Sequence, residues 1–409
     1  MLQAPGLFEG VGIELEYMIV DRSSLDVRSL SDKVLYAIAG AYEAEVAVGE
    51  LAWSNELVLH VIELKTCGPR PDLSGLSALF HRDVQRIGEI LEPFGACLMP
   101  TAMHPWMDPE SETRLWPHEY NQVYEAFDRI FDCRGHGWAN LQSVHINLPF
   151  QGDDEFGRLH AAIRMVLPIL PALAASSPFV NGQATGLLDT RLDYYRRNCM
   201  RVPALTGRVI PEAVFSRDEY ESGILGRLYR DIEAFDPDGV LRYEWLNARG
   251  AIARFDRSAI EIRLLDVQEC PRADMAISAA VIALIRALVE ERWLSWADQK
   301  RWPEERLARI LEATIRDADH AQVSDLEYLK DMGLCTAGPV SAAGLWRDLI
   351  ARSLPASQAA EHSDALECIL GEGSLASRML RVRSQDRASL PELYRSLCDC
   401  LRSNRMFRM

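Results

Sequence analysis

The chain is short of lysine and lacks several widespread catalytic motifs. Its only lysines stand at positions 33, 65, 300 and 330, so arginine, with its planar pair of donors, would have to bind most phosphate groups. No GxxxxGKS, GxxxxGKT, HExxH or GxSxG sequence occurs, which excludes a Walker-type phosphate loop, an HExxH zinc protease and a hydrolase nucleophile elbow. The segment Gly371 to Ala376 mimics a dinucleotide-binding fingerprint, but no predicted strand precedes it, so a Rossmann site is not indicated.

Long apolar runs and paired cysteines are also missing. The longest apolar stretch, from Met275 to Ile285, is too short to cross a bilayer, and the N-terminus has no basic segment leading into an apolar one. The nine cysteines include no CxxC pair, so neither a disulfide framework nor a zinc knuckle is indicated. We therefore expect a cytoplasmic protein with reduced thiols and no membrane partner.

Positive charge is scarce overall. The net charge of −16 at pH 7 argues against duplex nucleic acid or an anionic membrane surface as a partner, so a small-molecule substrate is favoured, and a homodimer stays open. With 409 residues the chain is long for one compact domain. We expect a catalytic domain over residues 1–295 and a C-terminal extension over 296–409, because the pattern from about residue 296 is almost entirely helical.

Acidic residues gather on segments that have the pattern of strands. From Val11 to Val20 the sequence predicts a strand with Glu14 and Glu16 on one face and apolar side chains on the other. Three later segments repeat this arrangement: 57–65 with Glu63, 141–148 with His145, and 259–265 with Glu261 and Arg263. A solvated strand face usually mixes lysine, threonine and serine with its acids. Four strands whose polar positions are nearly all acidic or histidine indicate one shared site.

A cation is the simplest way to hold such a site together. Two carboxylates about 4 Å apart repel by roughly 4 kcal/mol at an effective dielectric constant near 20, and the four glutamates would form several such pairs. Ligands that are mostly carboxylates with one imidazole favour Mg²⁺ or Mn²⁺, whereas zinc prefers more histidine or cysteine. These ions commonly carry nucleotide phosphates. The alternative is that each glutamate lies on the solvated face of an ordinary antiparallel strand.

The remaining pattern predicts helices between and after these strands. Apolar residues recur at helical spacing over 31–44, 73–92, 117–132, 155–175 and 272–293. Pro168 and Pro171 should kink or break the fourth of these helices. A further short strand is expected at 96–99, followed by a loop from Thr101 to Trp106.

Six groups of short motifs occur in an order that indicates a family. They are Gly12-Ile13-Glu14-Leu15-Glu16, Glu56-Leu57 with Glu63-Leu64-Lys65-Thr66, Met103-His104-Pro105, Val144-His145-Ile146-Asn147, Ser177-Pro178-Phe179 with Thr185, Gly186 and Arg191, and Ile260-Glu261-Ile262-Arg263-Leu264-Leu265-Asp266. In this order they resemble the family 2 glutamate-cysteine ligases, the carboxylate-amine ligase group. The resemblance spans residues 8 to about 290. It implies an α+β fold of the glutamine synthetase/guanido kinase type, in which an antiparallel sheet binds ATP and divalent metal ions on a concave face and helices lie behind it.

The resemblance also implies a reaction. In such ligases the γ-phosphate of ATP passes to a substrate carboxylate, and an amine attacks the resulting acyl phosphate to give an amide and ADP. By this resemblance the ligands of the Mg²⁺ or Mn²⁺ ions that bridge the ATP phosphates would be Glu14, Glu16, Glu63, His145 and Glu261. Arg263 would be the catalytic residue that offsets charge on the transferring phosphoryl group. The alternative is that Arg263 only pairs with Glu261.

Four further residues are expected to bind substrate. Arg191 and Arg249 match positions where the family has arginines, and His104 lies in the Met-His-Pro loop, where the alternative is a packing role. Glu56 precedes Glu63 by seven residues, so an unbroken strand would place the two on opposite faces. A bulge or a loop position would bring Glu56 back into the site.

The substrates are expected to be an amine and the carboxylate of an amino acid or peptide, with glutamate and cysteine as the first pair to test. Asn247 and Gly250, on either side of Arg249, replace the Asp and Pro usual in the family, which leaves the amine open. Two other functions remain open as well. One is a phosphotransferase that stops at the phosphorylated product, and the other is a non-catalytic protein that binds metal and nucleotide.

Overall fold

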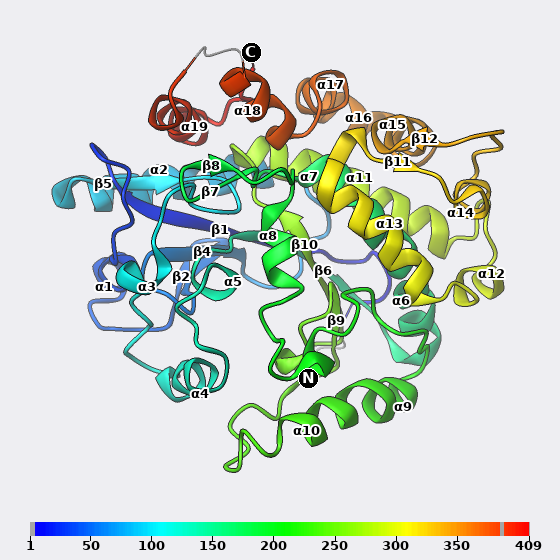
Figure 1. The fold of residues 1–409 in the computed structure, drawn as a ribbon, viewed down its shortest axis with the longest axis horizontal. Coiled ribbons are helices and arrows are strands. Elements are labelled where there is room, and N and C mark those ends of the chain that lie inside the picture. The colour runs from blue at the N-terminus through cyan, green and yellow to red at the C-terminus, as the bar shows by residue number, and fades with distance from the viewer. Residues whose placement is uncertain (1–4, 385–387, 409) are drawn as a thin grey trace.

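Eight strands form one antiparallel sheet at the centre of the fold (Figure 1). The coordinates are a computed structural model, which describes residues 5–384 and 388–408. The strand order is β2-β3-β4-β1-β6-β10-β9, and β5 pairs with the C-terminal half of β1. The strands are β1 (Gly12–Asp21), β2 (Glu45–Val48), β3 (Leu51–Asn55), β4 (Val61–Thr66), β5 (Ala96–Met99), β6 (Ser143–Pro149), β9 (Ala251–Arg254) and β10 (Ala259–Asp266).

Helices surround this sheet, and two small hairpins lie outside it. The hairpins are β7 (Phe179–Val180) with β8 (Gln183–Ala184), and β11 (Gln322–Val323) with β12 (Val340–Ser341). The helices up to residue 295 are α1 (Ser31–Ala39), α2 (Leu76–Leu91), α3 (Pro109–Glu112), α4 (Asn121–Phe131), α5 (His136–Ala139), α6 (Gly152–Val166), α7 (Pro171–Ala174), α8 (Thr190–Tyr195), α9 (Arg217–Tyr220), α10 (Gly226–Ile232) and α11 (Pro271–Val289). The later ones are α12 (Trp296–Lys300), α13 (Glu304–Asp317), α14 (Leu326–Asp331), α15 (Ala342–Ser353), α16 (Ala356–Glu361), α17 (Ser363–Glu372), α18 (Leu375–Ser384) and α19 (Leu390–Ser403). Among the described residues, we find no helix with both the length and the apolar character that crossing a membrane requires.

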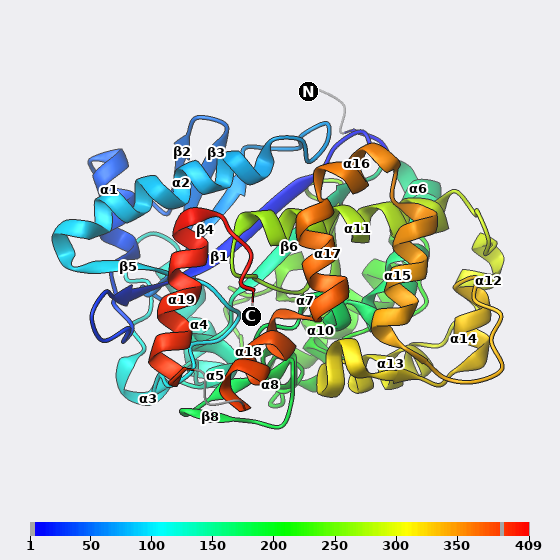
Figure 2. The ribbon, with the colours of Figure 1, turned by 90° about the horizontal axis from the view of Figure 1, so that it is seen from above.

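The period of two along β1 separates two environments. Ile13, Leu15, Tyr17 and Ile19 are fully buried in the main apolar core, together with side chains of α2, α6 and α11. Helix α11 packs against α2, α6 and α15 (Figure 2). The burial of this apolar face holds β1 in the middle of the sheet and leaves the opposite face for the polar residues.

The C-terminal helices pack on the same body of protein. Side chains of α13, α15 and α17 belong to the main apolar core. Helices α18 and α19 form a second apolar cluster with Met18 and Val20 of β1. These two residues lie on the same face of β1 as Glu14 and Glu16, so α18 and α19 cover one end of the acidic face. The division of the chain into domains at residue 295 stays a prediction.

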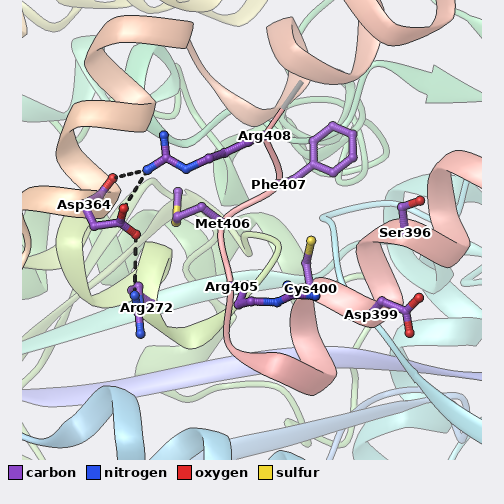
Figure 3. Close-up of a pocket in the computed structure, with 9 residues that line it drawn as sticks. All are labelled: Arg272, Asp364, Ser396, Asp399, Cys400, Arg405, Met406, Phe407 and Arg408. Carbon is purple, nitrogen blue, oxygen red and sulfur yellow. Dashed lines mark hydrogen bonds and ion pairs between the residues drawn. The ribbon is translucent and has the colours of Figure 1, made fainter. Parts of the chain in front are cut away.

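The last residues that the structure describes are tied to the core by a buried ion pair. The amide of Phe407 donates to Glu269 Oε1 at 3.2 Å, and Arg378, itself paired with Glu269, donates to the Phe407 carbonyl. Arg408 binds Asp364 at 2.7 Å. A cavity of about 640 Å³ opens between this tail, the start of α11, α17 and α19 (Figure 3). The tail therefore joins elements that lie far apart in the sequence.

The predicted elements agree with the structure except around residues 40–60. The strand at 96–99 and the break of the helix at Pro168 and Pro171 are confirmed. The strand predicted over 57–65 is wrong at its start, because β4 begins at Val61. Residues 57–59 instead bond to the 114–116 loop, with Leu59 N donating to the Arg114 carbonyl at 2.8 Å. The helix predicted over 31–44 ends at Ala39, and the β2–β3 hairpin after it was not predicted.

Two buried histidines predict that acid destabilises the fold. Burial lowers the pKa of His60 to about 4 and that of His160 to about 3. The unfolded chain takes up a proton at each near pH 6.5, so stability is retained above that pH and falls as the pH drops toward about 4. We expect a loss of about 2 kcal/mol per histidine between pH 7 and 5, measured by urea unfolding.

The matched comparison uses His160→Gln and His320→Gln, since His320 is exposed. Only His160→Gln should flatten the dependence of the unfolding free energy on pH. Identical slopes in both variants would contradict the prediction.

Candidate active site

Strand register brings the five predicted ligands onto one face of the sheet. On β1, Glu14 lies opposite His145 of β6, and Glu16 lies opposite Glu63 of β4. On the far side of β6, Glu261 of β10 lies opposite Asn147. Residues directly opposite each other in antiparallel strands share a face, so four adjacent strands supply one cluster.

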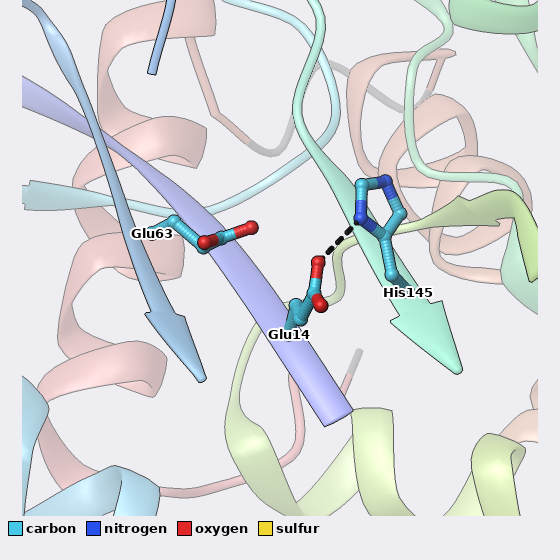
Figure 4. Close-up of side chains that lie close together, drawn as sticks. All are labelled: Glu14, Glu63 and His145. Atoms are coloured by element: carbon cyan, nitrogen blue, oxygen red, sulfur yellow. Dashed lines mark hydrogen bonds and ion pairs between the residues drawn. The ribbon is translucent and has the colours of Figure 1, made fainter. Parts of the chain in front are cut away.

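Hydrogen bonds fix the orientation of this cluster. His145 Nδ1 lies 2.9 Å from Glu14 Oε2, and Figure 4 shows the imidazole turned toward that carboxylate. The other ring nitrogen, Nε2, bonds Ser143 Oγ at 2.9 Å. Ser143 also donates its amide to Glu16 Oε2 at 2.7 Å, and Asn147 Nδ2 donates to Glu14 Oε1 at 2.9 Å. The side chains are therefore held in place by the sheet itself.

Glu56 lies in the loop after β3, not on a strand, and this position brings it into the cluster. Ligand atoms of Glu16, Glu56 and Glu63 all lie within 4.8 Å of one another. Ligand atoms of Glu14, Glu63 and His145 meet the same limit. Glu63 is common to both groups, so the acidic face offers two overlapping sets of three ligands.

Burial and mutual repulsion disturb the protonation of these groups. Burial, together with the charge of neighbouring glutamates, raises the pKa of Glu16, Glu56 and Glu63. Burial alone would also raise the pKa of Glu14, but the hydrogen bond from His145 lowers it. Burial would lower the pKa of His145, but its hydrogen bond with Glu14 and the surrounding carboxylates raise it to about 9. The cluster therefore favours bound cations.

Three permanent cations border the cluster. Lys65 Nζ lies 3.0 Å from Glu63 Oε2, Arg263 Nε lies 3.0 Å from Glu261 Oε1, and Arg254 Nη1 lies 3.6 Å from Glu261 Oε2. The cluster holds five carboxylates, and the positive groups near them are these three cations and one histidine. One negative charge therefore stays uncompensated, or two carboxylates share a proton. The oxygen-rich donor set fits a hard divalent ion.

Several residues of this site were not found from the sequence. They are Lys65, Ser143, Asn147 and Arg254. The first three stand two residues from Glu63 or His145 on the same strand, so the period of two could have identified them.

Arg191 lies beside the cluster but is only 2% exposed. Its Nε donates to the buried carboxylate of Asp266, and Nη1 and Nη2 both donate to the carbonyl of Arg263 at 3.4 Å. Asp266 belongs to the motif that carries Glu261 and Arg263. The assignment of Arg191 to substrate binding stays a prediction.

Arg249 and His104 are bound to their own surroundings. Arg249 donates to both carboxylate oxygens of Glu212 at 2.5 and 2.6 Å and is 1% exposed. His104 Nε2 bonds the Leu25 carbonyl at 2.8 Å, and Nδ1 accepts from the amide of Met107 at 2.9 Å. Both ring nitrogens of His104 thus order the loop. The assignment of these two residues to substrate binding stays a prediction.

Comparison with known proteins identifies the family. The profile of glutamate-cysteine ligase family 2 matches residues 10–397. The chain belongs to this family. The match continues well past residue 290, so the C-terminal helices lie within the family's own length.

Similar proteins and structures agree with this family. A protein of Archaeoglobus fulgidus, described only as uncharacterized, is 35% identical over 326 residues, which are 78% of this chain and 87% of the relative. A Pseudomonas aeruginosa protein named "Putative glutamate--cysteine ligase 2" is 28% identical over 410 residues, with 96% and 95% of the two chains covered. The structure of glutamate–cysteine ligase from Francisella tularensis has a TM-score of 0.63 at 11% identity, covering 98% of this chain and 90% of that one. The mixed fold of helices and antiparallel sheet is therefore shared with glutamate–cysteine ligase.

The donor set predicts a divalent ion that binds through Glu63. Mn²⁺ should raise the melting temperature of the protein, since a ligand that binds only the folded state stabilises it. Glu63→Gln should weaken Mn²⁺ binding by about 10-fold or more. Replacing a residue that only hydrogen-bonds to a metal ligand typically costs that much affinity, and loss of a ligand itself should cost at least as much. Without metal this variant should change stability little, because removing one of several repelling charges offsets the lost ion pair with Lys65. Calorimetric titration with Mn²⁺ measures the affinity.

Glu45→Gln is the matched control, because Glu45 contacts Lys65 at 2.8 Å but belongs to neither set of ligands. Equal Mn²⁺ affinity in both variants would remove Glu63 from the site.

Proposed function

We propose that this protein is an ATP-dependent ligase that joins an amine to the carboxylate of an amino acid or peptide. The γ-phosphoryl group of ATP passes to a carboxylate oxygen of the substrate, which gives an acyl phosphate and ADP. The amine nitrogen then attacks the acyl carbon, inorganic phosphate leaves, and the nitrogen loses a proton to give the amide. Glutamate and cysteine are the first pair to test.

The observation that carries this proposal is the cluster of five buried or partly buried glutamates and His145 beside Arg263. A site of this kind suits phosphoryl transfer, in which positioning and charge neutralisation supply most of the catalysis. Membership of glutamate-cysteine ligase family 2 supports ligation as the overall reaction. The Francisella tularensis structure contains AMP, which supports a nucleotide site in a protein of this fold.

The chain's own residues have distinct tasks in this proposal. Magnesium or manganese ions would be held by Glu14, Glu16, Glu56, Glu63, His145 and Glu261, and would neutralise the phosphate charges when bound. Arg263 lies on the same face, 27% exposed and paired with Glu261 through Nε, and its guanidinium would offset charge on the transferring phosphoryl group. The acidic face of the sheet would be the concave face that carries ATP.

Products distinguish this function from the two alternatives. Purified protein is incubated with ATP, MgCl₂ and glutamate, with or without cysteine or another amine, and nucleotides are separated by chromatography. We expect ADP, never AMP, together with an amide that requires the amine. ADP with a stable phosphorylated product and no amide would indicate a phosphotransferase. Nucleotide binding without turnover would indicate a non-catalytic protein. AMP with pyrophosphate, or full turnover in EDTA, would refute the mechanism.

Arg263→Lys tests the catalytic assignment. Lysine keeps one charge but loses the planar pair of donors, so kcat should fall by about 10²-fold or more while the KM for ATP changes little. Arg257→Lys, at an exposed position of the β9–β10 turn, is the control and should leave both constants unchanged. A lower melting temperature with near-normal kcat in Arg263→Lys would show a purely structural role.

A further inference from the structure

Strand β10 contains a bulge beside the acidic cluster. Pairing with β6 is regular up to Ile262 opposite Ile146 and resumes at Leu265 opposite Val144. Arg263 and Leu264 together therefore face the single residue His145. Bulges of this type bend a strand and redirect side chains, and they recur next to active sites.

The bulge decides which face Asp266 occupies. Five residues after Glu261, Asp266 would lie on the opposite face of an unbroken strand. The extra residue shifts it so that it pairs with Ser143, the residue that bonds Glu16. Both charged ends of the motif, Glu261 and Asp266, thus lie on the acidic face.

Asp266 holds Arg191 at two points. Its Oδ1 accepts the Nε proton of Arg191. Its Oδ2 accepts the hydroxyl of Ser177 at 2.9 Å, and Ser177 Oγ in turn accepts the main-chain amide of Arg191 at 3.0 Å. One buried carboxylate therefore fixes both the backbone and the side chain of Arg191. These bonds hold the guanidinium in the orientation described next.

In that orientation Arg191 binds the backbone of the bulge. Both Nη groups donate to the carbonyl of Arg263 at 3.4 Å. The amide of Arg263 donates to the carbonyl of Gly250 at 2.9 Å. A Cβ on Gly250 would lie 2.7 Å from the side chain of Leu264, so only glycine leaves room for the second residue of the bulge. Hydrogen bonds therefore hold both the amide and the carbonyl of Arg263.

We propose that Arg191, fixed by Asp266, is a positioning residue that aims Arg263 at the acidic cluster. This rests on the proposed function, in which Arg263 acts on the phosphoryl group. The 2% exposure of Arg191 suits contact with the main chain better than contact with a substrate. Glu261, Arg263 and Asp266 then have connected roles. Glu261 binds the metal ion, Arg263 acts on the phosphoryl group, and Asp266 positions Arg263 through Arg191.

Kinetics separate positioning from substrate binding. Arg191→Lys and Asp266→Asn should each lower kcat for ADP release about 10-fold or more, with MgCl₂, glutamate and cysteine present, while the KM values for ATP and glutamate change less than about 2-fold. In an Arg263→Lys background, Arg191→Lys should cause no further loss. Arg378→Lys, which disturbs another buried arginine–glutamate pair, is the control and should lower the melting temperature with little effect on kcat.

A KM for glutamate that rises 10-fold or more at unchanged kcat would assign Arg191 to the substrate and overturn the proposal. A readout without turnover is the ¹⁵N resonance of Arg263 Nε, assigned by its loss in Arg263→Lys. It should shift in Arg191→Lys and Asp266→Asn and not in Arg378→Lys, and an unchanged resonance would refute the positioning role. Absence of ADP from the wild type would instead count against the proposed function, while the resonance still decides this inference.

Discussion

Repulsion between like charges on neighbouring strands is the constraint on which the rest of the structure depends. Each close pair of carboxylates costs roughly 4 kcal/mol at an effective dielectric constant near 20, and Glu16 and Glu63 lie directly opposite each other. The other face of β1 opposes this cost, since each fully buried residue such as Ile13 or Leu15 contributes about 1.5 to 3 kcal/mol. The cations that border the cluster reduce the remaining repulsion, and so do the hydrogen bonds that Ser143 and Asn147 of β6 donate to Glu16 and Glu14. The sheet is thus stabilised on one face so that the other can hold charge.

Local periodicity made much of the fold and of the acidic cluster predictable. Glu14 and Glu16 stand out because they alternate with the apolar residues Ile13, Leu15 and Tyr17 in the first half of β1. The helix of residues 155–175 breaks where two prolines remove backbone donors. Glu56 fitted no single pattern, because it lies in the loop between β3 and β4, and β3 belongs to a hairpin that was not predicted. That hairpin is short, and its alternation was hidden between a helix and a loop.

The parts that could not be predicted depend on contacts between distant segments. The partnership of Arg191 with Asp266 joins residues 75 positions apart, and a sequence pattern carries no record of it. The bulge in β10 was not predicted either: Glu261 to Leu264 alternate regularly, and the break in alternation at Leu264-Leu265 was read as part of an ordinary strand. His104 and Arg249 were expected at a substrate site from the family resemblance alone, and the main-chain and carboxylate partners of their polar atoms could be found only in the structure.

The cover that α18 and α19 place over Met18 and Val20 has a consequence for the order of folding. It joins the first strand of the chain to its last two helices, so the loop closed by this contact spans nearly the whole protein. Contacts of such long sequence separation form late, because their entropic cost must be met before they contribute stability. One end of the acidic face is therefore covered only after α18 and α19 have been synthesised. A chain still in synthesis carries the acidic residues before the helices that cover one end of their face.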